Sequence, residues 1–159
     1  VVNVQGDEPF LETAQLELVL DCFRTPDTQI ATLVKRITDS ETLGNPNTPK
    51  VVFDHEGRAI YFSRNPIPYL RGAAPGTWLN HCDYYKHIGV YGYRTDVLRE
   101  IVQLPMGRLE QAESLEQLRW LENGYAIHVA ETTAESAAID TPEDLARVLA
   151  MMEAGEYHR

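Results

Sequence analysis

Val1-Val2-Asn3-Val4-Gln5-Gly6-Asp7-Glu8-Pro9 opens the chain and sets the fold that we expect for it. Its β-branched residues predict a buried strand, and Gly-Asp-Glu-Pro predicts a tight loop directly after that strand. In an open α/β sheet, ligands bind beyond the carboxyl ends of the strands, where Asp7 would lie. A carboxylate at that place suits a Mg²⁺ ion that also binds phosphate oxygens. The alternative is that Asp7 and Glu8 are ordinary turn residues, and this stretch alone favours neither interpretation.

Length and composition describe an ordinary globular chain. Its 159 residues suffice for one domain with a substantial core, and 43% of them are apolar. Two cysteines, Cys22 and Cys82, are too few for a disulfide framework or a zinc cage, so we expect a reducing cytoplasm. The net charge of −10 argues against a nucleic-acid partner. No apolar run reaches membrane-spanning length, so we expect no membrane partner.

The first residue is unusual for such a chain. It is Val1 rather than Met, and it stands inside what reads as a core strand. A core strand needs neighbours on both sides, and nothing precedes this one. We therefore expect the chain to be a fragment whose amino-terminal part is missing.

Strands alternate with helices along the rest of the sequence, which predicts the α/β class. An Asp-His-Glu-Gly-Arg loop, with an exposed His55, indicates a β-hairpin inserted between residues 50 and 62. The predicted helices cover residues 14–24, 95–102, 109–123 and the segment that starts at Pro142. The predicted strands outside the hairpin cover residues 29–37, 86–94 and 125–131, and the predicted loops cover residues 41–49 and 72–80.

The strand at 86–94 shows a clean period of two. Its alternation predicts two faces, one with Ile88, Val90 and Gly92 and the other with His87, Gly89, Tyr91 and Tyr93. The second face is rich in hydrogen-bonding groups, and its glycine lets a ligand approach the backbone. A single histidine in a strand is more often structural than functional, but its neighbours on this face favour a functional role.

Three further charged residues are candidates, each with an alternative. Arg64 precedes a rigid Asn-Pro-Ile-Pro segment and suits a carboxylate or phosphate, although from these residues alone a surface ion pair is the better explanation. Glu116 aligns with Ala112 and Trp120 in the predicted helix, and it faces a pocket or pairs with Arg119. Asp140 precedes the N-cap of the last helix, again where a strand gives way to a helix.

Five segments together resemble one family. The chain is similar, from Val1 to its final helix, to the 3-deoxy-manno-octulosonate cytidylyltransferases, the CMP-Kdo synthetases of Gram-negative lipopolysaccharide synthesis. The segments that carry the resemblance are Val2-Asn3-Val4-Gln5-Gly6-Asp7-Glu8-Pro9, Tyr61-Phe62-Ser63-Arg64-Asn65-Pro66-Ile67-Pro68, His87-Ile88-Gly89-Val90-Tyr91-Gly92-Tyr93-Arg94, Leu115-Glu116-Gln117-Leu118-Arg119 and Ile139-Asp140-Thr141-Pro142-Glu143-Asp144-Leu145.

The resemblance implies a fold and an activity. The fold would be Rossmann-like, a mixed sheet flanked by helices with a β-hairpin insertion, and residues 1–159 would be the C-terminal portion of one nucleotidyltransferase domain. The substrates would be CTP and the sugar acid Kdo, the product CMP-Kdo, and the assembly a homodimer. By match, Asp7 and Asp140 would be catalytic and would hold Mg²⁺. The sugar site would consist of Gln5, Arg64, His87, Tyr91, Glu116 and Gln117.

The sequence departs from the family in one respect. The family's amino-terminal loop over the CTP phosphates is absent here, so we expect little or no transferase activity from this chain alone. Two other readings stay open. One is a related activity, such as transfer of CMP to a neuraminic acid, and the other is a non-catalytic sugar-binding or dimerisation module.

Overall fold

A computed structural model describes residues 1–4 and 11–134 of the chain. The first half contains β1 (Val2–Asn3), α1 (Thr13–Cys22), β2 (Ile30–Arg36), α2 (Ser40–Gly44), β3 (Lys50–Phe53) and β4 (Ala59–Ser63). The second half contains the 3-10 helix η1 (Pro75–Asn80), β5 (Tyr85–Tyr93), α3 (Thr95–Ile101), α4 (Arg108–Glu113), α5 (Gln117–Glu122) and β6 (Ile127–Glu131). Within the described ranges, no helix is long and apolar enough to cross a membrane.

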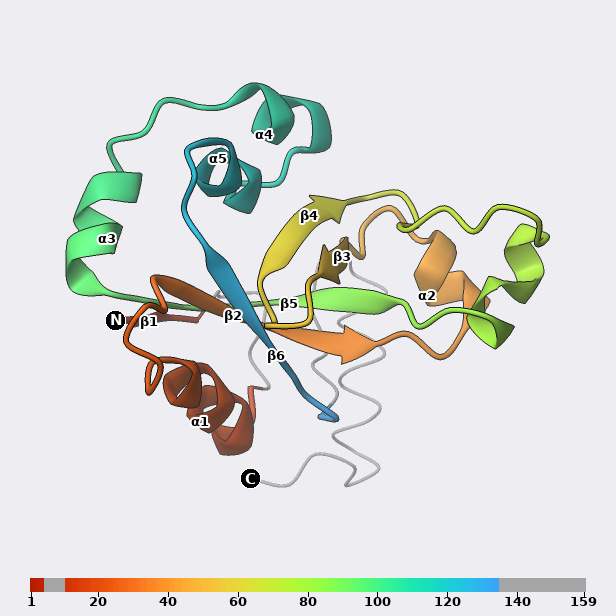
Figure 1. The fold of residues 1–159 in the computed structure, drawn as a ribbon, viewed down its shortest axis with the longest axis horizontal. Helices are drawn as coiled ribbons and strands as arrows, with labels where there is room; N and C mark the ends of the chain where they lie inside the picture. Colours follow the sequence, from red (N-terminus) through yellow and green to blue (C-terminus); the bar gives the residue numbers. More distant parts are fainter. Residues whose placement is uncertain (5–10, 135–159) are drawn as a thin grey trace, which may run out of the picture.

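Six strands form one mixed sheet, which confirms the predicted α/β class. Five of them follow the order β4-β3-β5-β2-β6, and β1 pairs with β5 outside this order. The pair β2–β6 is parallel, whereas β5 runs antiparallel to β1, β2 and β3. Figure 1 shows helices on both sides of the sheet, with α1 on one face and α3 to α5 on the other.

The two faces of β5 are covered as its alternation predicts. On the α1 face, one core cluster contains Val19, Ala31, Leu33, Ile88 and Val90. The other face carries the larger cluster, in which Tyr91 and Tyr93 of β5 pack with Trp120 of α5. Gly92 faces α1 so closely that an added Cβ would lie 2.6 Å from the Phe23 ring. The period of two in the sequence therefore assigned both faces correctly.

The predicted hairpin is confirmed as β3 and β4, which pair antiparallel. Asp54 closes its loop, because one carboxylate oxygen accepts from the backbone N–H groups of Glu56 and Arg58 at 2.9 Å each. Gly57 adopts φ +75°, a conformation that a glycine tolerates. Its carbonyl accepts from the Val129 N–H at 2.8 Å, which anchors the hairpin tip on β6. His55 at the tip is exposed, as predicted.

The prediction of a buried strand at the start of the chain is wrong. The strand β1 has two residues, and the neighbouring Val1 and Val4 are 61% and 46% exposed. It pairs with β5 through Val2 and Asn3, and among the described residues no strand lies along its other edge. β-Branched residues indicate an extended backbone, whereas burial needs covering layers, and these depend on the tertiary structure.

The predicted helix at 109–123 is also wrong, because the structure divides it into α4 and α5. Ser114 ends α4 with φ +51°, in the left-handed region. Glu113, the last residue of α4, accepts hydrogen bonds from the Ser63 hydroxyl at 2.8 Å and the Arg64 N–H at 2.9 Å. These tertiary contacts fix the break, and the line of Ala112, Glu116 and Trp120 on one helix does not exist.

Two predicted loops contain short helices. The segment 41–49 overlaps α2, whose N-cap Asp39 accepts a hydrogen bond from the Thr42 N–H at 2.7 Å. The segment 72–80 contains η1, whose Trp78 packs in a third cluster with Ile37, Leu43 and Tyr84. The remaining predicted helices and strands that fall on described residues are present within about two residues of their bounds. The final helix, predicted from Pro142, lies outside the described residues.

Candidate functional site

The candidate site centres on Tyr91, in the second half of β5. Its ring lies between aromatic neighbours, with the Tyr93 ring stacked at 5.9 Å and the Trp120 ring edge-on at 5.2 Å. The residue is 3% exposed, and its hydroxyl has no hydrogen-bond partner of normal geometry in the described part of the chain, although the Thr32 side chain lies near enough to lower its pKa. A buried hydroxyl without a hydrogen-bond partner lowers the stability of the fold, and a ligand group that forms this hydrogen bond would recover the loss.

His87 lies beside Tyr91 on the same face of β5. Its ring is 5.3 Å from the Tyr91 ring and 5.3 Å, edge-on, from the Phe62 ring. The Nε2 atom is 3.0 Å from the hydroxyl oxygen of Thr32 in β2. Burial lowers the pKa of His87 from 6.5 to about 4. The imidazole is therefore neutral near pH 7, and in that form one ring nitrogen donates while the other accepts.

The start of α5 supplies the next two candidates. Gln117 is its first residue and is buried, whereas Glu116 precedes it and is exposed. Burial raises the pKa of the Tyr91 hydroxyl well above 10, the nearby Tyr93 and Glu116 raise it further, and the Thr32 side chain lowers it by less. Tyr91 is thus protonated at any physiological pH, and Glu116 is close enough for its charge to be felt at the hydroxyl.

The predicted pairing of Glu116 with Arg119 is weak in the structure. The Arg119 guanidinium instead binds Glu110 of α4 bidentately, at 2.7 Å through Nε and 2.5 Å through Nη2. The Glu116 carboxylate lies 3.8 Å from Nη2, which is a long ion pair, and its side chain is 64% exposed. Because Arg119 forms its close ion pair with Glu110, the Glu116 carboxylate is left able to accept hydrogen bonds from solvent or a ligand.

Arg64 follows β4 and is held by main-chain acceptors. Its Nε donates to the Glu113 carbonyl at 2.6 Å, Nη1 to the Pro46 carbonyl at 2.9 Å and Nη2 to the Ser114 carbonyl at 3.1 Å. The surface ion pair offered as an alternative is therefore not what holds this side chain. The guanidinium joins β4 to the α4–α5 junction, and Glu116 follows that junction by two residues.

The structure thus places His87 and Tyr91 side by side on β5, with Glu116 near enough to raise the pKa of Tyr91. Arg64 is joined to the α4–α5 junction, and Glu116 and Gln117 follow that junction in the chain. The other three candidates, Gln5, Asp7 and Asp140, lie outside the described residues. Within residues 1–4 and 11–134, no group of three or more His, Cys, Asp or Glu side chains is placed to hold a metal ion. The proposed metal ligands stay a prediction.

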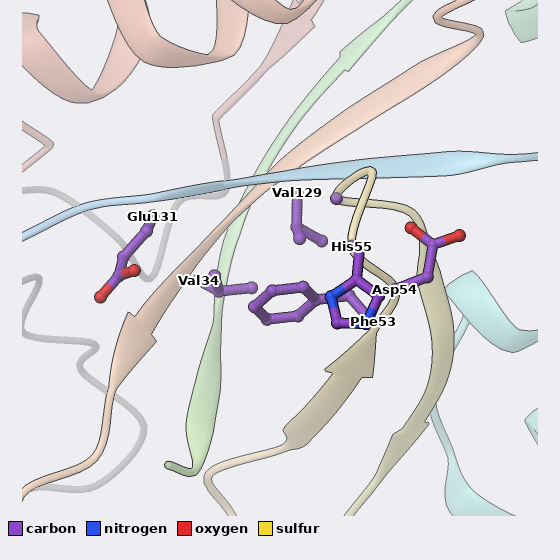
Figure 2. A pocket seen from close by; sticks show the side chains of 7 residues that line it. Val34, Phe53, Asp54, His55, Val129 and Glu131 are labelled. Atoms are coloured by element: carbon purple, nitrogen blue, oxygen red, sulfur yellow. The ribbon is translucent and has the colours of Figure 1, made fainter.

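A pocket of about 430 Å³ lies elsewhere, between the hairpin tip and β6. Figure 2 shows its apolar lining from Val34, Phe53 and Val129, with Glu131 set apart from Asp54 and His55. None of the candidate site residues lines it. The Asp54 carboxylate is occupied in the hairpin loop, where it also accepts from the Arg58 Nε at 2.9 Å. This pocket is therefore a feature of the hairpin rather than part of the candidate site.

Two supporting residues escaped the sequence analysis. Thr32 contacts His87 from β2. In the sequence, the only sign of this role is a hydroxyl side chain among the apolar residues at the centre of the strand. Glu113 holds both the Ser63 hydroxyl and the Arg64 N–H, and nothing in the sequence separates it from the other 23 acidic residues.

Comparisons with known proteins give one answer. The 3-deoxy-manno-octulosonate cytidylyltransferase of Porphyromonas gingivalis is 52% identical over 155 residues, which are 96% of this chain and 61% of that protein. The protein of the same name from Cytophaga hutchinsonii is 57% identical over 149 residues, 93% of this chain and 59% of that protein. The chain therefore spans about three fifths of the length of these relatives.

A solved structure agrees with these relatives. CMP:2-keto-3-deoxy-manno-octonic acid synthetase complexed with CTP superposes with a TM-score of 0.86 at 41% identity, over 97% of this chain and 61% of that one. The fold described here is thus the nucleotidyltransferase fold of that enzyme. The model of the cytidylyltransferase family matches residues 1–136, most of this chain. The chain belongs to the cytidylyltransferase family.

Proposed function

We propose that the protein containing this chain transfers CMP from CTP to the anomeric hydroxyl of 3-deoxy-D-manno-octulosonate (Kdo), giving CMP-Kdo and pyrophosphate. The relatives of 52% and 57% identity carry the name of this activity, and the similar solved structure is described with CTP bound. The chain would supply the sugar half of the site, on the face of β5 toward α5.

One observation carries the proposal, namely the buried Tyr91 hydroxyl that lacks a partner in the described chain. It lies beside the neutral imidazole of His87 and near the Glu116 carboxylate. One hydroxyl donor with acceptors around it matches a ligand rich in hydroxyl groups, because each sugar hydroxyl both donates and accepts. Arg64 would meet the sugar carboxylate with the guanidinium N–H groups that its three carbonyl bonds leave over.

Asp7 and Asp140 would hold Mg²⁺, for which two carboxylates are a suitable donor set. When bound, the metal would offset negative charge on the α-phosphate of CTP. We also propose a cytoplasmic homodimer that serves lipopolysaccharide synthesis, as the name of the relatives suggests. In this scheme Tyr91, His87, Glu116 and Gln117, together with Gln5, orient the sugar hydroxyls.

Isothermal titration of Kdo into the chain, with and without Mg²⁺, tests the proposal. We expect saturable binding that Mg²⁺ strengthens, and we expect Asp7→Asn to remove the effect of the metal. N-acetylneuraminate is the matched competitor, because it is also a keto-sugar acid with a carboxylate at the anomeric carbon. We expect Kdo to bind at least about 10-fold more tightly, a difference of about 1.4 kcal/mol.

The other outcomes identify the alternatives. Tighter binding of N-acetylneuraminate would replace Kdo by a neuraminic acid as the substrate. Kdo binding that neither Mg²⁺ nor Asp7→Asn changes would favour a sugar-binding module without catalysis. Absence of binding by either sugar acid would remove the sugar site from this part of the protein.

A further inference from the structure

Thr32 has a special place in the sheet. It is fully buried in β2, on the same face as His87 and Tyr91 of the neighbouring strand β5. The pairing register shifts at this residue, because Thr32 opposes Tyr91 whereas the next residue, Leu33, opposes Ile88. Two extra residues of β5 therefore form a bulge directly between the two candidate ligand residues. Bulges of this kind often lie next to active sites, where they redirect a side chain.

The Thr32 hydroxyl fills this bulge and makes three close contacts, and it also lies near enough to the Tyr91 hydroxyl to lower the pKa of Tyr91. Its oxygen is 2.8 Å from the Val90 carbonyl oxygen, 3.1 Å from the Ile88 carbonyl oxygen and 3.0 Å from Nε2 of His87. A carbonyl oxygen only accepts hydrogen bonds, so both carbonyl contacts compete for the single hydroxyl proton. The Val90 carbonyl makes the shortest contact, and with its proton donated there the hydroxyl accepts, rather than donates, toward the imidazole.

This arrangement determines the tautomer of His87. A neutral imidazole carries one N–H, and the contact with Thr32 requires it at Nε2. The Nδ1 atom then holds the lone pair, and no hydrogen bond from Nδ1 is found among the described residues. Because Tyr91 presents a hydroxyl donor next to this ring, the two side chains offer a donor and an acceptor side by side.

We propose that Thr32 is a positioning residue that holds His87 in the Nε2–H tautomer, so that Nδ1 accepts a hydrogen bond from a hydroxyl group of the sugar acid. The assignment of the ligand rests on the proposed function, whereas the assignment of the tautomer rests on the hydrogen-bond geometry alone. Thr32 would not touch the sugar, and it would act through His87.

Long-range ¹H–¹⁵N NMR spectra of the ¹⁵N-labelled chain read the tautomer directly. The His87→Gln spectrum assigns the signals, and we expect a protonated Nε2 and an unprotonated Nδ1 at neutral pH. In Thr32→Val, which keeps the shape but loses the hydroxyl, we expect a mixture of both tautomers. In Thr32→Ser, which keeps the hydroxyl, we expect the Nε2–H form alone. A purely structural role for Thr32 would not move this signal.

Kdo titration of the same three chains tests the consequence for binding. We expect affinity about 10-fold weaker in Thr32→Val and close to the parent value in Thr32→Ser. An Nδ1–H tautomer in the unsubstituted chain would overturn the proposal, even if Thr32→Val fails to fold. Unchanged Kdo affinity in a folded Thr32→Val chain would overturn the link to the sugar. The expected tautomer without any Kdo affinity would overturn the proposed function and leave the positioning of His87 intact.

Discussion

Tyr91 carries a buried hydroxyl that has no partner among the described residues, so removing it should separate stability from binding. We expect Tyr91→Phe to keep the free energy of unfolding unchanged or raise it by up to about 1 kcal/mol, because an unsatisfied polar group disappears. Kdo affinity should fall about 10-fold, since the same hydroxyl would serve the sugar. Urea unfolding and isothermal titration measure the two effects.

Tyr69→Phe is the matched control, because Tyr69 is 75% exposed and lies outside the candidate site. It should change neither quantity. A loss of stability of about 2 kcal/mol in Tyr91→Phe would mean instead that the hydroxyl has a strong partner in the folded chain.

His87 predicts a dependence of stability on pH. Its pKa is about 4 in the folded chain, because of burial, and its ordinary value in an unfolded chain is 6.5. Between these values the unfolded state binds more protons, so the free energy of unfolding falls as the pH decreases from 6.5 toward 4. The total loss is roughly 3 kcal/mol. Above pH 6.5 this contribution is constant.

Urea unfolding at about pH 7.5 and about pH 5 measures about 2 kcal/mol of this loss. The lower pH stays above the range in which Asp39 and Glu110 titrate, since both have lowered pKa values. The variant His87→Gln should lose much less stability between the two pH values. An equal loss in the variant would assign the pH dependence to other groups.

At the scale of elements, α1 packs closely on β5 because residue 92 of β5 is a glycine, which has no side chain. A Cβ at Gly92 would lie 2.6 Å from the Phe23 ring and 2.7 Å from the Val19 side chain, so in Gly92→Ala these side chains or α1 itself must move. We expect a loss of about 1–3 kcal/mol in the free energy of unfolding. Gly44→Ala, where nothing lies within 4 Å, is the control and should be neutral or slightly stabilising. Equal effects of both substitutions would contradict the close approach.

The α4–α5 unit depends on the ion pair of Glu110 and Arg119. Their side chains are 7% and 17% exposed, so Glu110→Gln leaves a largely buried guanidinium without its carboxylate. We expect a loss of about 1–3 kcal/mol by urea unfolding. Asp21→Asn breaks the exposed pair with Arg24 and should have little effect. If both substitutions lower the free energy of unfolding by the same amount, burial does not strengthen the ion pair of Glu110 and Arg119.

At the scale of the whole molecule, the net charge of −10 acts on stability through self-repulsion. Sodium chloride screens this repulsion, since the Debye length falls from about 30 Å at 0.01 M to about 8 Å at 0.15 M. We expect the thermal midpoint to rise by a few degrees, roughly 2–4 °C, over that range, as differential scanning calorimetry would show. A falling midpoint would mean that surface ion pairs, such as Asp54 with Arg58, outweigh the repulsion.

Local patterns in the sequence determined most of the elements and the face of β5 on which two candidate residues lie. The period of two in β5 placed Tyr91 and His87 on one face, and the loop after Phe53 announced a hairpin, because these features arise from backbone geometry over a few residues. The same reading recovered the α/β class and, through the five matching segments, the family.

The tertiary structure decided what neighbouring segments impose on one another. The break at Ser114 follows from contacts of Glu113 with β4, which is 50 residues away in the sequence, and Arg64 is held by carbonyl groups that no pattern reveals. The exposure of Val4 and the contact of Thr32 with His87 likewise depend on which strands lie side by side. Burial and hydrogen-bond partners are properties of packing between distant segments, and sequence periodicity reports only the geometry within one segment.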